Sequence, residues 1–415
     1  MRFLYEFGIS AYAAILRLVA LWHPKARQMV EGRRDWREKL RSAMGCRKGR
    51  VVWFHCASLG EFEQGRPIME AFMHQHPDWQ LVLTFFSPSG YNVRKDYELA
   101  DLVLYLPLDT ASNARDFVGI LTPDCAFFVK YEIWRNMLKV LHQRSIPTFL
   151  VSAIFRPSQL FFKPYGGWYR RLLRRFTHIY VQDDDSRQLL EGIGMQQVTV
   201  AGDSRFDRVA AAASSVRELA PVARFAEGHR VLIAGSTWPP DEEHLLSLAG
   251  QLPEGWKIIL APHEIEDGRI DRWIGRVGLP ALRYTRLTAE SPLEQSRVLI
   301  VDTIGILLSV YQYGDLAYIG GGFGAGIHNT LEPAAFGMPV IFGPNNQRFR
   351  EAQELMEEGA AYSIDNADGL LSLALPLMRQ PEALRVAGDK ARGYVQDNTG
   401  ASQLVLFGVN RIIQA

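Results

Sequence analysis

The sequence contains few cysteines and has almost no net charge. Its 415 residues include three cysteines (Cys46, Cys56 and Cys125) without a CxxC pair, and the formal net charge is +1. An odd set of scattered thiols argues against a disulfide or zinc framework and favours a reducing compartment. The small net charge gives no overall bias towards nucleic acid, and no cluster of histidine, cysteine and aspartate has metal-ligand spacing. We therefore expect no metal site and no nucleic-acid partner.

The sequence also lacks a long apolar run free of charge. Residues 3–22 are largely apolar but contain Glu6 and Arg17, which would be costly in hydrocarbon, and no small-residue cleavage site follows closely. The next segment, 24–50, holds ten Lys and Arg against three acids. An apolar helix beside a polybasic segment fits the cytoplasmic face of an anionic membrane, by short insertion or by surface anchoring. The alternative is an ordinary buried N-terminal helix with a solvated charged face.

Neither the Rossmann G-x-G-x-x-G fingerprint nor the P-loop motif fits the most informative stretch, 316–344. Glycine occupies positions Gly320, Gly321, Gly322, Gly324 and Gly326. A short helical pattern follows at 330–336, so free backbone N–H groups and the positive end of a helix dipole would meet beside His328. This arrangement predicts a phosphorylated ligand, whereas a plain capping box of Asn329 and Glu332 is the alternative.

Short apolar segments alternate with helical patterns along the chain, which is typical of doubly wound parallel sheets. The predicted strands span 51–55, 81–85, 102–106, 125–129, 148–151 and 179–181, then 231–234, 258–261, 298–301, 317–319 and 340–342. An Ala- and Ser-rich connection near 210–225 separates the two series. We therefore expect an N-terminal segment (1–50) and two Rossmann-like domains (51–215 and 216–415), with ligands between the carboxyl ends of both sheets.

Polar residues follow the predicted strands of the first half. Ser58, Gly60 and Glu61 come after the first strand, where a glutamate beside a glycine could take a proton from an attacking hydroxyl. Ser58 and Glu61 also have the spacing of a capping box, and the pattern alone favours that interpretation. Lys130 and Glu132 follow the fourth strand and share a face, where they could form an ion pair or bind an anionic sugar.

Further candidates lie near the domain junction and in the second half. Arg205 suits bidentate recognition of phosphate or carboxylate, although the pattern alone favours a surface ion pair. Ser236 and Thr237 predict a hydroxyl-lined helix N-terminus, which could bind phosphate or only cap the helix. Pro262 and His263 end a strand, and the histidine could contact a base or ribose or lie solvated in a loop.

One stretch of the first half combines basic and aromatic residues. Between Arg156 and Gln182 there is no acid, and FFKPYGGWYRRLLRRF interleaves the two residue types. Such a patch could dock a phosphorylated lipid head group or a single-stranded nucleic acid. The near-neutral total charge and the apolar N-terminus favour lipid.

Together these motifs resemble the Kdo (3-deoxy-D-manno-octulosonate) transferases, glycosyltransferases of lipopolysaccharide synthesis. The segments that carry the likeness lie in the family's order: EGRRDWREKL, WFHCASLGEFEQGRP, KYEIWRNML, VSAIF, GDSRFD, GSTWPPDEE, APHEIE, VDTIGIL and GGGFGAGIHNTLEPAAFGMPVIFGPN. The resemblance implies a GT-B fold, with two doubly wound Rossmann-like domains facing a central cleft and an N-terminal apolar helix. It also implies metal-independent, inverting transfer of Kdo to a lipid A precursor (lipid IV-A). CMP-Kdo would be the donor substrate, without a cofactor, at the cytoplasmic face of the inner membrane and its anionic lipids.

The resemblance assigns roles to single residues as well. It makes Glu61 the general base, which reverses the capping interpretation, and it places stabilisers of the transition state at Glu132 and Arg205. Lys130 stands where the family's ETELW-like segment has its first acid, so the chain departs from the pattern there. Contacts with CMP-Kdo are implied for Pro262, His263, Ile304, Gly305, Ile306, Asn329, Thr330, Leu331 and Glu332.

Three other functions stay open from the residues alone. The first is another GT-B nucleotide-sugar enzyme, either a UDP-sugar transferase or an epimerase. The second is a non-catalytic, membrane-attached binding protein, for which Lys130 is the best argument. The third is a single-strand nucleic-acid binder that uses 156–176, and salt-sensitive RNA binding would identify it.

Overall fold

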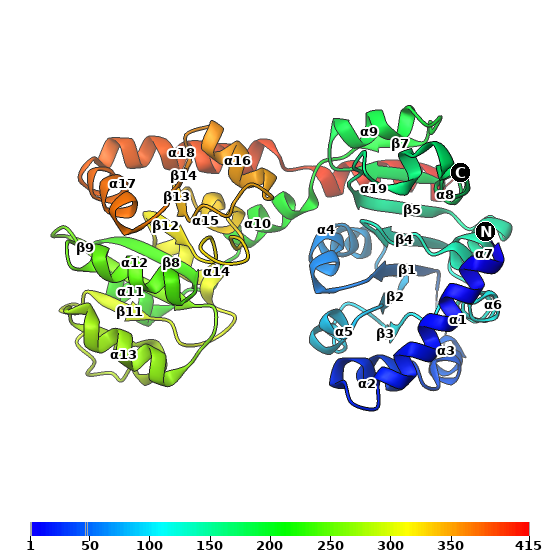
Figure 1. Cartoon of the computed structure of the whole chain (residues 1–415), viewed down its shortest axis with the longest axis horizontal. Coiled ribbons are helices and arrows are strands. Elements are labelled where there is room, and N and C mark those ends of the chain that lie inside the picture. Colours follow the sequence, from blue (N-terminus) through cyan, green and yellow to red (C-terminus); the bar gives the residue numbers. More distant parts are fainter. Residues whose placement is uncertain (1, 46, 48, 415) are drawn as a thin grey trace. The chain divides into compact units, whose positions relative to one another are not determined.

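The computed structural model of the chain describes residues 2–45, 47 and 49–414. Cys46 and Lys48, which entered the counts of thiols and basic residues, lie outside this part. The chain divides into two compact units, Met1–Arg208 with Thr399–Ala415, and Val209–Asn398. Both chain ends therefore belong to the first unit, as Figure 1 shows.

The first unit contains a parallel β-sheet, which has seven strands in the part of the chain that the structure describes. In spatial order its strands are β3 (Leu102–Tyr105), β2 (Gln80–Phe85), β1 (Val51–Cys56), β4 (Cys125–Val129), β5 (Thr148–Ala153), β6 (His178–Val181) and β7 (Val198–Val200). All of β1 is buried, because alternate residues enter different cores: Trp53 joins one cluster and Phe54 the other. Burial on both faces explains the continuous apolar runs that predicted these strands.

Helices cover both faces of this sheet (Figure 1). They are α1 (Arg2–Val19), α2 (Pro24–Glu31), α3 (Trp36–Gly45), α4 (Leu59–Gln75), α5 (Pro88–Arg94), α6 (Ala111–Leu121), α7 (Arg135–Gln143), α8 (Gly167–Leu173), α9 (Asp184–Glu191) and α19 (Ala401–Ile413), with two short 3-10 turns, η1 (Leu160–Phe162) and η2 (Pro164–Gly166). Helix α10 (Ser204–Ser214) begins in the first unit and ends in the second.

The second unit repeats the arrangement. Its strands, in spatial order and all parallel, are β10 (Ala281–Arg283), β11 (Val298–Ile300), β9 (Trp256–Pro262), β8 (Arg230–Thr237), β12 (Leu316–Ile319), β13 (Val340–Phe342) and β14 (Ala361–Ser363). Its helices are α11 (Ala220–Ala226), α12 (Pro239–Ala249), α13 (Asp267–Val277), η3 (Tyr284–Arg286), α14 (Leu307–Val310), η4 (Tyr311–Tyr313), α15 (Leu331–Ala335), α16 (Arg350–Glu357), α17 (Ala367–Arg379) and α18 (Pro381–Asp397).

Each sheet has one position where the direction of winding reverses. The chain builds β1, β2 and β3 towards one edge and then returns to lay β4 against β1. In the second unit β12 returns to β8 in the same way. Loops after the two adjoining strands diverge at such a switch point and leave a crevice at the carboxyl ends, where ligands of doubly wound sheets bind. The candidate residues after β1, β4, β8 and β12 all lie at these two positions.

The last helix does not belong to the unit in which the sequence places it. Residues 399–415 fall in the range predicted for the second domain, yet α19 packs on the first unit. Val405, Leu406 and Val409 are buried in the same cluster as Phe54. The carboxylate of Asp207 accepts hydrogen bonds from the backbone N–H groups that begin α19, which fixes the returning chain.

The N-terminal helix is amphipathic. Phe3 and Phe7 are 86% and 73% exposed, and Ile15, Leu18 and Trp22 continue the row. On the opposite side Tyr5 donates to Asp109 Oδ2 at 2.6 Å, and Glu6 pairs with Arg135 at 3.3 Å. No helix in the described part of the chain is both long and apolar enough to cross a membrane. The prediction of an apolar N-terminal helix is therefore not supported, because α1 uses polar side chains to bind its own unit.

Candidate functional site

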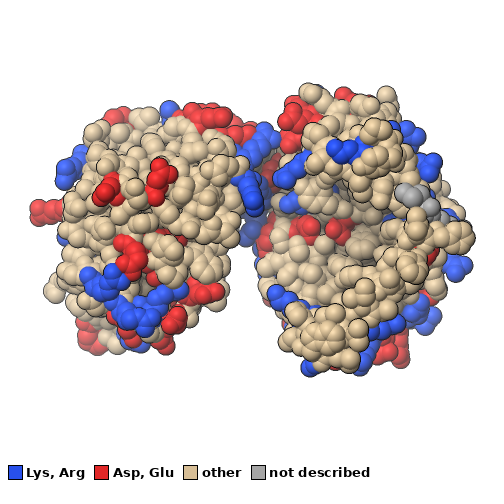
Figure 2. Space-filling model, in the orientation of Figure 1, with Lys and Arg blue, Asp and Glu red and all other residues tan. Residues whose placement is uncertain are grey.

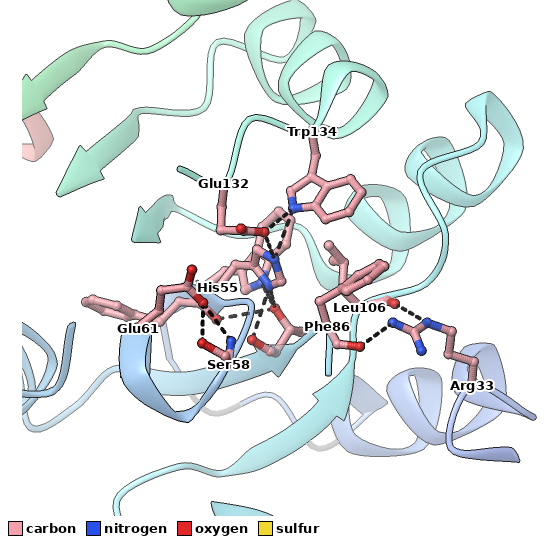
Figure 3. Close-up of polar contacts among 11 residues, drawn as sticks. Arg33, His55, Ser58, Glu61, Phe86, Leu106, Glu132 and Trp134 are labelled. Carbon is pink, nitrogen blue, oxygen red and sulfur yellow. Dashed lines mark hydrogen bonds and ion pairs between the residues drawn. The ribbon is translucent and has the colours of Figure 1, made fainter. Parts of the chain in front are cut away.

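The candidate residues of the first unit lie at the carboxyl ends of β1 and β4. His55 is the fifth residue of β1 and pairs with Phe128 of β4, so the loops that follow both strands leave the sheet side by side. Glu132 lies on the loop after β4 and Glu61 in the first turn of α4, and Figure 3 shows them with His55, Ser58 and Trp134. Burial raises the pKa of the Cys56 thiol well above its usual value, and the charges of Glu61, Glu132 and Glu63 add to the rise. Cys56 is therefore an uncharged thiol beside a cluster of carboxylates.

Glu61 forms the capping box that its spacing predicts. It is the third residue of α4, and its Oε2 accepts hydrogen bonds from Ser58 N at 2.7 Å and Ser58 Oγ at 2.8 Å. The other carboxylate oxygen, Oε1, has no hydrogen-bond partner in the part of the chain that the structure describes. Gly60 is exposed, and a Cβ there would have only Ser58 Oγ within 4 Å, at 3.9 Å. The carboxylate is thus held through one oxygen and leaves the other towards open space.

Glu132 is 9% exposed and is held on two sides. Its Oε2 accepts a hydrogen bond from the indole of Trp134 at 2.7 Å and lies 3.1 Å from His55 Nε2 (Figure 3). Among the described residues Glu132 does not form the pair with Lys130 that the sequence suggested; its partners come from the strand beside it and from its own loop. A buried carboxylate needs such partners, because desolvation without compensation is costly.

Lys130 directly follows β4 and has a left-handed backbone conformation, with φ of 67°, a strained value for a residue other than glycine. Burial lowers the pKa of its ammonium group, the carboxylate of Glu61 opposes the shift, and the nearby Arg205 adds to it. Lys130 therefore lies close enough to Glu61 to interact with its charge. The two residues come from loops that follow different strands, and the switch point brings them together.

Arg205 forms the ion pair that its sequence pattern favours. Its Nη2 and Nε lie 2.7 and 2.8 Å from Asp203 Oδ2, and its side chain is 35% exposed. The neighbouring Ser204 is buried, where it donates to the carbonyl of Gln64 and lies 2.9 Å from Ser152 Oγ. These bonds fix the start of α10 against the first unit and thereby fix the position of Arg205.

In the second unit several glycines of the glycine loop have no room for a side chain. Gly321 has φ of 92°, and a Cβ on Gly322 would lie 2.6 Å from the backbone of Gly343. The loop is therefore glycine-rich for packing reasons, because β12 and β13 bring two backbones into contact. The N–H of Gly321 is bound to Asp241 Oδ2 at 2.9 Å and is not available to a ligand.

The helix after the glycine loop is shorter than predicted. It spans Leu331–Ala335 instead of 330–336, and Thr330 takes the cap position without a side-chain bond. Asn329 Oδ1 accepts from Leu331 N at 3.1 Å, so the capping box with Glu332 does not form. A helix of five residues has a weak dipole, which reduces the electrostatic part of the predicted anion site. Thr330 Oγ1 is buried with no hydrogen-bond partner in the described structure, and a bound ligand would supply one.

Ser236 and Thr237 lie in a strand and not at a helix N-terminus. Strand β8 continues to Thr237, whose buried hydroxyl donates to Glu242 Oε1 at 3.2 Å. Helix α12 is instead capped by Asp241, whose Oδ2 accepts from Trp238 N at 2.9 Å. The prediction of a hydroxyl-lined helix N-terminus is therefore wrong, because the strand continues three residues beyond Ala234, where its predicted apolar run ends.

Three aromatic rings form a stack at the carboxyl ends of β8, β9 and β12. The ring of His263 lies 4.6 Å from that of Trp238 and 4.3 Å from that of His328, centre to centre. The indole of Trp238 donates to His328 Nε2 at 3.0 Å. Burial lowers the pKa of His328, the neighbouring His263 adds to the fall, and Asp241 opposes it. The stack begins next to Pro262, so Pro262, His263 and His328 of the prediction do lie together.

The loop after β11 presents Ile304 to solvent, with 86% of its side chain exposed, and Gly305 adopts φ of 92°. Asp302 anchors the loop: its Oδ1 accepts from Thr285 N and its Oδ2 from Arg283 Nε, both at 2.8 Å. Burial alone would raise the pKa of Asp302, but these hydrogen bonds lower it overall. An exposed isoleucine on an anchored loop, with Ile306 as the last residue before α14, suits contact with a ligand.

Among the described residues no group of three or more His, Cys, Asp or Glu could hold a metal ion. The side chains gathered at the two switch points include carboxylates, imidazoles and Lys130. Cys56 and Cys125 are both buried free thiols.

Comparison with known proteins shows which family the chain resembles. Residues 34–208 match the family model described as 3-Deoxy-D-manno-octulosonic-acid transferase (kdotransferase). The chain is 28% identical over 375 residues to the 3-deoxy-D-manno-octulosonic acid transferase of Bordetella pertussis, which covers 86% of each chain. It is 27% identical over 352 residues to the protein of that name from Chlamydophila psittaci, covering 80% of this chain and 78% of the relative.

The chain is related to the Kdo transferases. The resemblance predicted from its motifs is thereby confirmed, and the matched segment includes Glu61, Lys130, Glu132 and Arg205. Among solved structures, the UDP-GlcNAc 2-epimerase from Neisseria meningitidis bound to UDP-GlcNAc has a TM-score of 0.62 at 13% identity and covers 87% of this chain and 100% of that one. At this identity the likeness concerns the fold alone, and it confirms two doubly wound Rossmann-like domains of the GT-B type.

Several residues that organise the site were not predicted from the sequence. His55 and Trp134 hold Glu132 in the first unit, Thr84 holds His55, and Asp241 and Trp238 hold the glycine loop and the histidine stack in the second. Apart from Trp134, which follows Glu132 closely, each of them acts on a residue far away along the chain, such as Asp241 on Gly321. The sequence signal that could have found Asp241 is its position three residues after Trp238, the spacing of a capping box.

Asp241→Asn tests whether one carboxylate organises the glycine loop. Asp241 accepts from Tyr318 Oη, Gly321 N and Trp238 N, and an asparagine would turn a donor towards at least one of these donors. We expect the free energy of unfolding to fall by about 1–3 kcal/mol, and the amides of residues 320–328 to exchange faster in hydrogen-exchange mass spectrometry. Tyr318→Phe is the control, because it removes one donor and should leave exchange in the loop unchanged. Equal exchange in Asp241→Asn and the wild type would contradict the assignment.

Proposed function

We propose that the protein transfers Kdo from CMP-Kdo to a lipid A precursor (lipid IV-A), with inversion at the anomeric carbon and Glu61 as the general base. The observation that carries the proposal is the position of Glu61, within the family segment and at a switch point, with Oε1 open. A hydroxyl within hydrogen-bond reach of Oε1 would lose its proton to it as the new bond forms. The two bonds from Ser58 to Oε2 would keep the carboxylate in one orientation.

In this proposal the second unit binds CMP-Kdo, which is the donor substrate and brings its own leaving group, so that no metal or cofactor is required. The unpartnered Thr330 Oγ1, the exposed Ile304 and the stack of Trp238, His263 and His328 offer a hydroxyl, an apolar contact and flat ring faces. Flat rings suit a base and a hydroxyl suits a ribose or phosphate. Asn329, Leu331 and Glu332 adjoin Thr330, as the family resemblance requires.

Lys130 and Arg205 are the positive charges of the first unit that the proposal assigns to stabilising the departing phosphate and the Kdo carboxylate. Lys130 lies near both Glu61 and Arg205, since their charges shift the pKa of Lys130 in opposite directions. Lys130 thus keeps a role in the site although the family pattern has an acid at this position.

Glu61→Gln tests the general base. The amide keeps an oxygen that can accept from Ser58, so the fold and CMP binding should be retained, whereas proton abstraction is lost. We expect transfer to a lipid A precursor to fall by a factor of about 10²–10⁴, measured by mass spectrometry of the products with CMP binding as the folding control. Near-normal turnover would remove Glu61 from the mechanism, and absence of transfer by the wild type would favour a non-catalytic binding protein.

The second candidate function is a UDP-sugar transferase or epimerase, and the likeness to the Neisseria meningitidis fold is the observation in its favour. Protection from thermal unfolding separates the two. We expect CMP, at 100 times its Kd, to stabilise the protein by about 2.7 kcal/mol, and UDP at the same concentration to give no shift. Stabilisation by UDP and not by CMP would replace the Kdo proposal with the alternative.

The proposed site of action is the cytoplasmic face of the inner membrane, where the exposed row of α1 would enter the lipid surface. Helix α1 lies on the outside of its unit, and Figure 2 shows mostly uncharged surface there with Lys and Arg atoms at its borders. Behind the row is a cavity of about 930 Å³ that includes Arg17, Arg34 and Arg41 in its lining. Apolar side chains backed by arginines suit an anionic surface.

Vesicle flotation tests this docking mode. Phe7→Ser combined with Trp22→Ser removes two exposed aromatic side chains from the row, and each is worth about 1.5–3 kcal/mol when buried. We expect the partition coefficient onto vesicles with anionic lipid to fall at least about tenfold, without loss of folding. Phe407→Ser is the matched control, because Phe407 is 68% exposed on α19 of the same unit. Equal flotation of the double variant and the wild type would exclude α1 as the docking surface.

A further inference from the structure

His55 is a buried histidine between two strands, in contact with one side of Glu132. Its side chain is 0% exposed, and its two ring nitrogens face different neighbours (Figure 3). Nδ1 lies 3.1 Å from the carbonyl oxygen of Thr84 and 2.9 Å from Thr84 Oγ1, on β2. Nε2 lies 3.1 Å from Glu132 Oε2, on the loop after β4. The ring therefore joins β2 to the loop after β4, which carries Glu132, across the end of β1.

The neighbours of Nδ1 favour a proton on this nitrogen. A carbonyl oxygen can only accept, so the 3.1 Å contact between Nδ1 and Thr84 O is a hydrogen bond only when Nδ1 donates. The Thr84 hydroxyl accepts from the indole of Trp53 at 2.8 Å and has the carbonyl of Phe54 as an acceptor at 3.3 Å. Its own hydrogen thus has a partner elsewhere. In a neutral imidazole with a proton on Nδ1, Nε2 would present a lone pair to Glu132.

A lone pair on Nε2 does not fit the contact with Glu132. The indole of Trp134 has one hydrogen, and its nitrogen lies 2.7 Å from Glu132 Oε2 and 3.1 Å from His55 Nε2. That hydrogen is directed at the shorter contact, so Nε2 and Oε2 would face one another at 3.1 Å with no proton between them. Two acceptors at this distance repel, and burial strengthens the repulsion. One further proton between Nε2 and Oε2 satisfies all three groups.

We propose that His55 and Glu132 form a proton-sharing pair, and that His55 and Trp134 are positioning residues for Glu132. The shared proton removes the net charge that Glu132 would otherwise add to the site. Its other oxygen, Oε1, has no hydrogen-bond partner within the described chain and is left for the substrate. The statement that Oε1 of Glu132 is left for the substrate rests on the function proposed above.

The shared proton reduces the negative charge at this switch point. Glu61 must be ionised to act as a base, and Glu63 lies on the same helix. A second bare carboxylate at Glu132 would repel Glu61 and, more importantly, a donor that carries both a phosphate and a carboxylate. With His55 holding the proton, Glu132 is a neutral hydrogen-bonding group towards the donor, and Lys130 is left to balance Glu61. Sequence analysis could not have found this role, because His55 reads as an interior strand residue.

The experiment that tests the pair counts protons directly. In full-length protein labelled with ¹⁵N-histidine, we expect both ring nitrogens of His55 to show the shifts of protonated nitrogens, with the signal identified by its absence in His55→Gln. In Glu132→Gln one of the two should become unprotonated, since the pair is broken. A neutral His55 in the wild type beside an ionised Glu132, seen with ¹³C-labelled glutamate, would overturn the proposal. This readout does not depend on transfer activity, so it is distinguishable from failure of the proposed function.

Kinetics of His55→Gln test the role in substrate binding. Glutamine can donate an N–H to Glu132 but supplies no shared proton, so Glu132 becomes a full carboxylate in nearly the same place. We expect KM for CMP-Kdo to rise about tenfold or more, with KM for the lipid acceptor changed less than about twofold. Trp134→Phe, which keeps the ring, should lower kcat and leave the proton on His55. His142→Gln, an exposed histidine of α7 in the same unit, is the matched control and should behave as the wild type. Equal effects on both KM values would overturn the role in substrate binding, as would a His55→Gln enzyme with unchanged KM for the donor.

Discussion

The parallel pairing of β1 with β4 is the constraint from which the first half of the site follows. Because these strands adjoin and the connections on either side run in opposite directions, the loops after them begin at the same edge and then diverge. Residues 61 and 132 meet there although 71 positions separate them, as does His55, which belongs to the strand itself. The pairing of β8 with β12 has the same effect on Asp241 and Gly321 in the second unit. Each seven-stranded sheet thus brings candidate side chains together at its switch point, and the remaining strands mainly keep that position rigid.

A structural and a catalytic role are compatible in Glu61 because a carboxylate has two oxygens. The capping box occupies Oε2 through both bonds from Ser58, and this satisfies the orphan N–H group at the start of α4. Oε1 is left without a partner in the described structure. The cap thereby fixes the direction of the free oxygen, which is what a general base requires. The same logic applies to Glu132, where His55 and Trp134 both bind Oε2. In each case the support is on one oxygen and the other is left for a ligand.

Sequence patterns located the central strands well and the edges poorly, for a physical reason. Central strands are buried on both faces, so β4 and β13 have the predicted limits, Cys125–Val129 and Val340–Phe342. The edge strands β7, β10 and β14 have three residues each, are only partly buried and gave no apolar run. The limits of β8 had a larger consequence, since three further residues of strand placed Ser236 and Thr237, which were expected at a helix cap, within the strand.

The residues of the site divide in the same way. Glu61, Glu132, His263 and His328 could be named in advance because loops after buried strands are where doubly wound folds bind ligands. The supports that come from other strands or loops could not, because each of these is a contact between distant segments. His55 looked like one more buried strand residue, and Asp241 like an acid in the first turn of a helix. Only the register of neighbouring strands shows that one reaches Glu132 and the other Gly321. Periodicity therefore predicts where a site is, while tertiary contacts decide what holds it.

The N-terminal helices take part in that support. Phe86, at the end of β2, stacks on the ring of Trp134 at 5.0 Å and on Tyr12 of α1 at 6.2 Å, centre to centre. Arg33, between α2 and α3, donates to the carbonyls of Phe86 at 2.7 Å and Leu106 at 2.8 Å (Figure 3). Burial lowers the pKa of Arg33 to about 10, and no carboxylate pairs with it in the described chain, so three backbone carbonyls and two aromatic rings hold its charge. Burying a cation that is bound only to carbonyls costs free energy. In return, Arg33 fixes the segment that contains Phe86, whose ring contacts that of Trp134. Helix α1 therefore belongs to the platform under Glu132 as well as to the outer surface of the unit.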